Sequence, residues 1–205
     1  MNRTLLKILG SFAVLGAAAS IAGLGTFASF TSSTSASQTI ASGTVSIILG
    51  PAGSATNRLT IGASNVVPGD TIQRAVDLVN NGTAASDTLS SIQLTTIAAP
   101  SSLLDTDATN GLQMVIDKCS VAWTEAGVAP AYTYTCGGTT LPVLGSRAVV
   151  GAALPLTNLA ALANTTTDHL RVTLTLPVAA GNTFQGLTSS ISYNFVGTQR
   201  LATAK

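Results

Sequence analysis

Short runs of alternating apolar and polar residues, separated by turn residues, are the feature that most restricts the fold of this chain. Thr, Val, Ile and Leu dominate these runs, and Gly, Pro, Asn or Asp follow most of them closely. Side chains of a β-strand point alternately to its two faces, so a two-residue period is typical of strands with one buried face. Strands are predicted over residues 44–49, 58–61, 71–79, 88–97, 112–116, 147–154, 169–178 and 188–196.

Strands of this length and spacing predict an all-β fold, and specifically a jelly-roll-like antiparallel β-sandwich. An immunoglobulin domain fits less well, because its two cysteines would lie much further apart along the chain. Only residues 156–163 have the apolar spacing of a helix, and the segment is short. We expect residues 1–29 to be removed and residues 30–205 to form this single domain.

The N-terminal residues have the pattern of an export signal. Arg3 and Lys7 precede the apolar stretch 8–25, and small residues follow it. This order is typical of a secretory signal peptide, predicted here to be cleaved after Ala28 or Ser29. A retained membrane anchor is the alternative, since about 18 apolar residues can just span a bilayer. Cleavage would leave a secreted protein without a membrane segment.

Charged residues make up only 8% of the chain, whereas soluble domains have roughly 25%. Without the leader, seven basic residues balance eight acidic ones. This balance excludes the basic stripe of a nucleic-acid-binding protein and a basic patch for anionic lipid. Ser, Thr, Asn and Gln must supply the surface polarity, so copies of the protein repel one another little. An ordinary secreted domain and a self-assembling protein fit this composition about equally.

Cys119 and Cys136 are an even count in a chain predicted to be exported, so a disulfide between them is expected. Closing a loop of this length should stabilise the fold by about 3 kcal/mol. A metal pair is the alternative, but the spacing matches no zinc pattern. The bond is predicted to join the two arms of a hairpin, residues 121–123 and 132–134.

Candidate catalytic or metal-binding residues are few. His169 is the only histidine, whereas a zinc hydrolase needs at least three protein ligands, so we predict a polar strand residue and no catalytic residue or cofactor. Asp105 and Asp107 lie in a polar loop whose oxygens could bind Ca²⁺, but the loop lacks the glycine and closing Glu of an EF-hand, so a solvated loop is favoured. Asn81 and Asn164 begin Asn-x-Thr sequences, which match glycosylation acceptors and also arise by chance.

Several segments occur in an order typical of one protein family. They are 25–30 followed by 40–45, the Pro-Gly-Asp turn 67–70 with the strand and Asn-Gly turn 76–83, and the closing segments 180–186 and 195–199. Together they resemble TasA, CalY and camelysin, secreted bacterial proteins released by a SipW-type signal peptidase. The chain departs from the family pattern in its cysteine hairpin, its shorter middle region and its low charge.

The resemblance implies a jelly roll and a role in building extracellular fibres of the biofilm matrix. In such fibres the N-terminal strand of one subunit completes a sheet of its neighbour. Some members are described as casein-degrading metalloproteases, which is the alternative activity that the resemblance implies.

Residues 30–49 are suited to the role of a donor strand, because they contain neither a charged residue nor proline. Edge strands are commonly protected by Lys, Pro or bulges, so an unprotected N-terminal strand can add to an edge of another copy. Val45, Ile47 and Leu49 are predicted to fill the apolar face of that partner. Pairing within its own sheet and a disordered tail are the alternatives.

We therefore predict a secreted, self-assembling structural protein whose partners are other copies of itself and, during export, a SipW-type signal peptidase. A secreted metalloprotease is less favoured, because metal ligands are lacking. A monomeric cell-surface adhesion domain is the remaining alternative.

Overall fold

The structure, a computed structural model, describes residues 46–60, 62–63, 65–84 and 87–201. The chain divides into two units, Met1–Ala41 and Ser42–Lys205, and every described residue belongs to the second. The predicted cleavage residues Ala28 and Ser29 therefore lie outside the described residues, as do residues 30–45 of the predicted donor strand.

Strands dominate the described residues, and helix is limited to the single turns α2 (Leu103–Thr106) and η1 (Asn182–Phe184). The strands in chain order are β1 (Ile47–Leu49), β2 (Thr71–Asn80), β3 (Leu89–Ala98), β4 (Gln113–Cys119), β5 (Thr124–Ala126), β6 (Thr133–Thr135), β7 (Thr140–Ala148), β8 (Gly151–Pro155), β9 (Thr167–Thr175) and β10 (Ile191–Gln199). No helix among these residues has the length and apolar character needed to cross a membrane.

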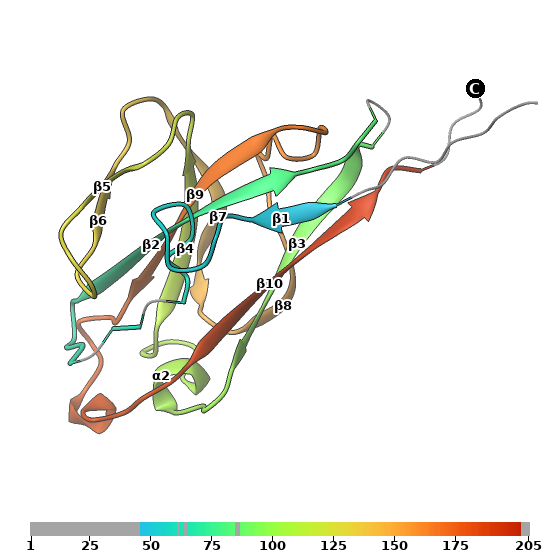
Figure 1. Cartoon of the computed structure of the whole chain (residues 1–205). Helices are drawn as coiled ribbons and strands as arrows, with labels where there is room; N and C mark the ends of the chain where they lie inside the picture. The colour runs from blue at the N-terminus through green and yellow to red at the C-terminus, as the bar shows by residue number, and fades with distance from the viewer. Residues whose placement is uncertain (1–45, 61, 64, 85–86, 202–205) are drawn as a thin grey trace, which may run out of the picture. The chain divides into compact units, whose positions relative to one another are not determined.

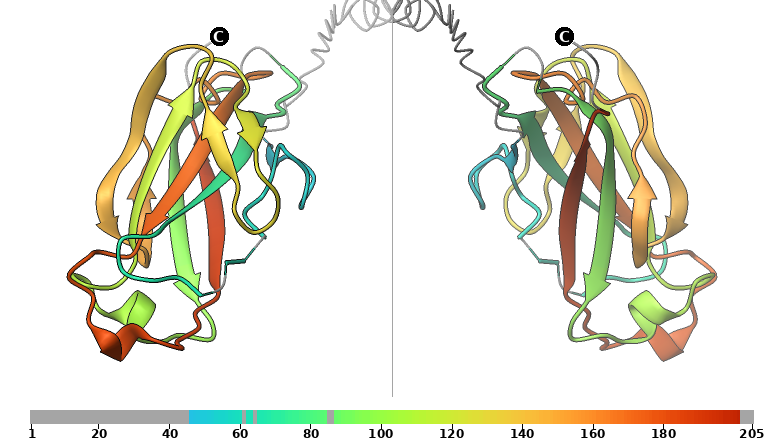
Figure 2. Two further views of the ribbon diagram at one scale, coloured as in Figure 1. Left: turned by 90° about the vertical axis from the view of Figure 1, so that its left-hand side faces the viewer. Right: turned by 90° about the vertical axis from the view of Figure 1, so that its right-hand side faces the viewer.

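The strands form three sheets, and every pairing is antiparallel, as the sequence predicted (Figure 1). The largest has the order β1-β2-β9-β4-β7, the second the order β10-β3-β8, and β5 pairs with β6 alone. In the largest sheet β9 lies between β2 and β4, so strands that are far apart in the chain pair with one another. The two larger sheets form two layers in both views of Figure 2.

Alternate side chains of these two sheets meet in one hydrophobic core. Strands β2, β4 and β9 contribute from one side, and β3 and β10 from the other. Burial of each of these Leu, Ile or Val side chains stabilises the fold by about 1.5–3 kcal/mol. The fully buried members include Val76, Leu78, Ile92, Leu94, Met114, Ile116 and Leu170.

The side chain of Asn80 bonds the backbone on both sides of the turn from β2 to β3, and the carboxylate of Asp87 accepts from two further backbone N–H groups there. Oδ1 of Asn80 accepts a hydrogen bond from Gly82 N (2.9 Å), and its Nδ2 donates to Asp87 O (3.2 Å). A Cβ on Gly82 would lie 2.6 Å from Cβ of Asp87, so this position requires glycine. The Asn-Gly turn predicted at the end of this strand is therefore confirmed.

Three local predictions were wrong. Residues 58–60 are not in a strand; only the preceding Asn57 forms an isolated bridge, to Val76. The run 147–154 covers parts of two strands in different sheets, β7 and β8. Residues 156–163 form a loop rather than a helix.

Candidate functional site

The described part of the predicted donor strand, residues 46–49, lies at the edge of the five-stranded sheet. Residues 46–50 follow the edge of β2, residues 51–55 loop away, and residues 56–58 return to it. Four backbone hydrogen bonds mark these contacts: Asn81 N to Ser46 O (2.7 Å), Gly50 N to Asp77 O (3.2 Å), Asp77 N to Thr56 O (2.8 Å) and Arg58 N to Ala75 O (2.8 Å). The edge strand is thus short and interrupted.

Side chains of β1 alternate between core and solvent. Ile47 and Leu49 pack against the hydrophobic core, whereas Ile48 is 46% exposed. Ile47 also reaches β10, since its Cδ1 lies 3.5 Å from the position that a Cβ on Gly197 would occupy. In the single chain, β1 pairs with β2 of its own sheet, from Ile47 opposite Asn80 to Leu49 opposite Leu78. Val45, the third predicted assembly residue, lies outside the described residues.

Cys119 and Cys136 form the predicted disulfide, with a Cα–Cα distance of 5.6 Å. The bond joins the end of β4 to the residue after β6, so it ties the β5–β6 hairpin to the five-stranded sheet. The hairpin strands begin slightly later than predicted, and Trp123 precedes β5.

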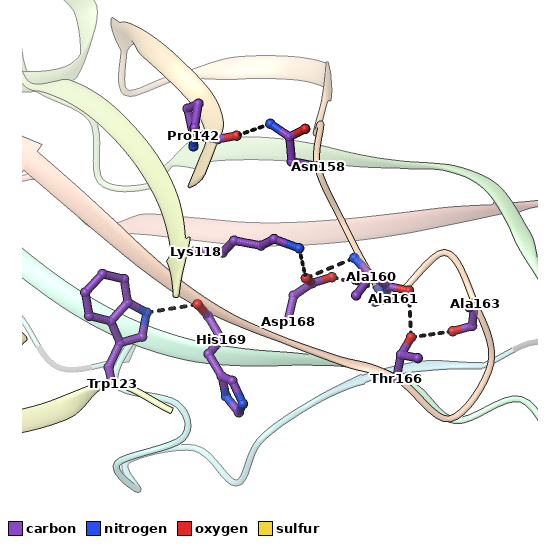
Figure 3. A network of polar contacts seen from close by, with 10 residues as sticks. All are labelled: Lys118, Trp123, Pro142, Asn158, Ala160, Ala161, Ala163, Thr166, Asp168 and His169. Atoms are coloured by element: carbon purple, nitrogen blue, oxygen red, sulfur yellow. Dashed lines mark hydrogen bonds and ion pairs between the residues drawn. The ribbon is translucent and has the colours of Figure 1, made fainter. Parts of the chain in front are cut away.

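Hydrogen bonds also hold the hairpin over the outer face of this sheet. Tyr134 N donates to Oε1 of Gln73 on β2 (3.1 Å), and Arg171 Nη1 on β9 donates to Tyr134 O (3.2 Å). Nε1 of Trp123 donates to His169 O (2.9 Å), as Figure 3 shows. The guanidinium of Arg171 lies 4.3 Å from the centre of the Trp123 ring, which adds a cation–π contact.

Strand register places hydrogen-bonding side chains directly opposite one another beneath the hairpin. Arg171 is opposite Asp117, and their side chains meet at 2.5 Å (Nη2–Oδ2) and 3.1 Å (Nε–Oδ1). His169 is opposite Asp77, with its Nδ1 2.7 Å from Oδ1. These pairs lie on the outer face because the intervening residues of β9 point into the core.

An ion pair also links the hairpin to the edge segment. Arg58 binds Glu125 of β5 through Nη2–Oε1 (2.6 Å) and Nε–Oε2 (2.9 Å). The hydrogen bond from Arg58 lowers the pKa of Glu125, despite partial burial, and the same bond raises the pKa of Arg58. Burial, followed by the hydrogen bond to Glu125, raises the pKa of Tyr134 to about 12. Glu125 is therefore held as a carboxylate and Tyr134 as a phenol at neutral pH.

Asp168 organises the loop where a helix was expected. Its buried carboxylate accepts hydrogen bonds from Lys118 Nζ (2.8 Å), Ala160 N (3.0 Å) and Ala161 N (2.7 Å) (Figure 3). The hydroxyl of Thr166 closes the loop by donating to the carbonyl oxygens of Ala160 and Ala163. In a helix, the N–H groups of residues 160 and 161 would point along the helix axis toward backbone carbonyls. Here they donate to Asp168 instead, so the segment forms a loop.

The segment predicted as a solvated loop begins with the helical turn α2, and its Asp105 is buried, so the prediction was wrong for this residue. Local donors bind both carboxylates of the segment. Asp105 caps α2 by accepting from Ser102 N (2.8 Å), and it also accepts from the hydroxyls of Ser101 and Ser189 (2.5 Å each). Burial raises the pKa of Asp105, but the hydrogen bonds from these serines outweigh it and the net pKa is lowered. Asp107 accepts from Thr109 N and Asn110 N (2.9 Å each).

The described residues do not provide a set of ligands for a metal ion. The part of the chain that the structure describes has no group of three or more His, Cys, Asp and Glu side chains that could hold a metal ion. In the sequence, every residue of these four types falls within that part. The only imidazole, that of His169, contacts a single carboxylate, and both cysteines are in the disulfide.

Comparison with known proteins identifies a relationship over half of the chain. A family model described as camelysin metallo-endopeptidase matches residues 5–115. The match covers most of the predicted leader, β1 to β3 and the first residues of β4, and it ends before the disulfide hairpin. No curated protein matches the chain.

Proposed function

The chain belongs to the camelysin family, and on this premise we propose that it is a secreted structural protein that forms extracellular or biofilm-matrix fibres by donor-strand exchange. Donor-strand exchange means that a strand of one copy takes a place in a sheet of the next. The contact is heterologous and does not close on itself, so it produces filaments rather than a fixed oligomer.

The observation that carries this proposal is the short, interrupted edge strand. Only Ile47–Leu49 pairs regularly with β2 before the chain loops away. Few backbone bonds therefore oppose release of this strand, and the same bonds can form with a strand of another copy. Residues 30–45, which precede it, contain neither charged residues nor proline. Low charge also reduces repulsion between approaching copies, so salt should affect assembly weakly.

Family membership and the disulfide support an extracellular location, because disulfides persist mainly in oxidising compartments. The same resemblance supports a jelly roll as the wider class of this antiparallel fold. We propose that a SipW-type peptidase removes residues 1–29 and leaves no membrane segment. Sequencing of the secreted protein should begin at Ser29 or Phe30. A secreted form that retains the apolar stretch 8–25 would support a membrane anchor instead.

Deletion of residues 30–41 from the mature protein tests the assembly. The variant should fold but fail to polymerise, while the mature chain forms filaments visible by electron microscopy. Removal of residues 202–205, which also shortens a terminus, serves as the control and should leave filaments intact. Val45→Pro should also block assembly, because proline removes a ladder donor within the strand. Filaments of the deletion variant equal to those of the mature chain would refute donation from this end.

A metallo-endopeptidase activity is the second candidate, because the matching family model carries that description. The residues of this chain do not fit a zinc site, which needs three protein ligands and an open position. Casein hydrolysis by purified protein, measured with and without a chelator, separates the two functions. A chelator-sensitive activity with stoichiometric bound metal would favour the peptidase over the structural role.

A further inference from the structure

Residues 50–58, which we call the edge loop, lie along one edge of β2. Gly50 N donates to Asp77 O (3.2 Å), Asp77 N donates to Thr56 O (2.8 Å), and Arg58 N donates to Ala75 O (2.8 Å). The structure describes every residue of the edge loop, and none of them belongs to the hydrophobic core or packs against it as an apolar side chain. A segment held mainly by hydrogen bonds at an edge opens more readily than one with buried apolar contacts.

The edge loop is also bonded to itself. Asn57 Nδ2 donates to Gly50 O (2.9 Å), and Gly53 N donates to Asn57 O (2.8 Å). The two ends of the loop lie so close together that a Cβ on Gly50 would be 2.5 Å from Thr56 O. These bonds do not involve β2, so the loop can leave the edge of that strand as one unit.

Arg58 connects the edge loop to the β5–β6 hairpin. Its guanidinium binds both carboxylate oxygens of Glu125, with distances of 2.6 Å (Nη2–Oε1) and 2.9 Å (Nε–Oε2). The same guanidinium lies 4.7 Å from the centre of the Tyr132 ring, which adds a cation–π contact. Nη1 donates to Gly53 O within the loop. One side chain therefore contacts the loop and two residues of the hairpin region.

The hairpin is held in position without the edge loop. The disulfide ties it to β4, and Gln73 of β2 and Arg171 of β9 bond the backbone of Tyr134. The hydroxyl of Tyr134 also donates to Oε2 of Glu125 (2.9 Å), so the hairpin itself orients this carboxylate. An acceptor that is already oriented loses little conformational freedom when Arg58 binds to it.

Partial burial strengthens the contact between Arg58 and Glu125. Each side chain is only 18% exposed, whereas ion pairs in full contact with water contribute little to stability. A guanidinium that binds both oxygens of a carboxylate also forms a stronger hydrogen-bonded pair than a single contact does. The ring of Tyr132 lies near β2 as well, since the guanidinium of Arg74 is 5.8 Å from its centre.

We infer that the hairpin is a clasp that keeps the edge loop on β2 through the contact of Arg58 with Glu125 and Tyr132. When this contact breaks, the loop leaves and β2 presents unpaired N–H and C=O groups at its edge. Glu125 and Tyr132 lie outside residues 5–115, the region that the camelysin family model matches. The inference concerns a single chain and does not depend on fibre formation.

Hydrogen exchange of the mature chain, followed residue by residue by NMR, tests the clasp. The amide hydrogens of Gly50, Asp77 and Arg58 report on the edge, because each donates one of its hydrogen bonds. In Glu125→Gln these three amides should exchange about tenfold faster, since the neutral side chain has the same shape but no longer pairs with the guanidinium charge. The amides of β9, in the middle of the sheet, should keep their exchange rates.

Asp117→Asn is the matched control. Asp117 pairs with Arg171 beneath the same hairpin, and these side chains are 16% and 21% exposed, close to the values of the clasp. This pair joins β4 to β9 and leaves the Arg58–Glu125 contact in place. The control should therefore exchange the amides of Gly50 and Asp77 at the rate of the unsubstituted chain.

Two further variants test whether Arg58 acts through Glu125. Arg58→Lys keeps the positive charge but not the paired hydrogen bonds, so the amides of Gly50 and Asp77 should exchange about three- to tenfold faster. The double variant Arg58→Gln/Glu125→Gln should exchange no faster than the faster of its two single variants, because all three lose the same contact. Arg58→Lys also serves as the test if Glu125→Gln fails to fold.

Three results would overturn the clasp. Unchanged exchange at Gly50 and Asp77 in a folded Glu125→Gln or Arg58→Lys chain would show that the edge bonds hold the loop by themselves. Equal acceleration in Asp117→Asn would show a general loosening of the hairpin. Acceleration in β9 to the same extent as at the edge would show a loss of global stability rather than local opening.

Discussion

The disulfide offers a direct measure of what holds the β5–β6 hairpin in place. Cys119 and Cys136 are separated by 17 positions, and closing a loop of that size restricts the unfolded chain by about 3 kcal/mol. The double variant Cys119→Ser/Cys136→Ser should lose about this much stability. For a domain of this size the loss corresponds to a melting temperature lower by roughly 6–12 °C.

Thermal unfolding followed by circular dichroism and urea unfolding at one temperature provide the measurement. Chemical reduction of the native protein should give the same loss as the double substitution, because both remove the same constraint. The single variant Cys136→Ser is a useful control, because it breaks the same bond and should lose about as much stability as the double variant.

The folded hairpin itself should change little, because other contacts hold it to the sheet. Trp123, Tyr134 and Arg171 supply hydrogen bonds and a cation–π contact, and the Arg58–Glu125 pair adds a further link. Amide exchange in the hairpin should therefore remain slow in the double variant at temperatures well below melting. A stability loss below about 1 kcal/mol, or rapid exchange throughout the hairpin, would refute this reasoning.

Three further predictions concern the acidic range, the histidine and one turn. Because the hydrogen bond from Arg58 lowers the pKa of Glu125 below its ordinary value of 4.5, the stabilisation is present above that pH and is lost as the pH falls through the folded-state pKa; urea unfolding between pH 3 and 6 should show a shallower acid-side loss for Glu125→Gln. His169→Ala should leave any casein hydrolysis and bound zinc of the purified protein unchanged, since one imidazole cannot form a zinc site; loss of both would contradict the structural role. Gly82→Ala should lower the free energy of unfolding by about 1–3 kcal/mol, because the new Cβ meets Asp87 at 2.6 Å; an unchanged melting temperature would show that the turn relaxes freely.

Strands with one buried face could be predicted from local sequence. β2, β3, β9 and β10 alternate apolar and polar residues over nine or ten positions, and side-chain direction alternates with the same period. The all-β class and the Asn-Gly turn follow from such local preferences. The cysteine pair was also predictable, because only two cysteines occur and an exported chain has few other uses for them.

Properties that depend on neighbours from distant parts of the chain could not be predicted. β7 carries proline and glycine, and it forms a strand because β4 offers it an edge. The leucine spacing of 156–163 resembled a helix, but Asp168 binds the backbone of that segment and holds it as a loop.

In the candidate site, too, some features follow from local sequence and others depend on contacts between distant segments. Local alternation within Ile47–Leu49 was enough to indicate which of its side chains face an apolar surface. Whether an edge is protected depends on which strand lies beside it, on its register and on its bulges, and these arise only when distant segments pair. For this reason the sequence indicated a donor segment, whereas the strands that form the edges of the sheets became visible only in the assembled fold.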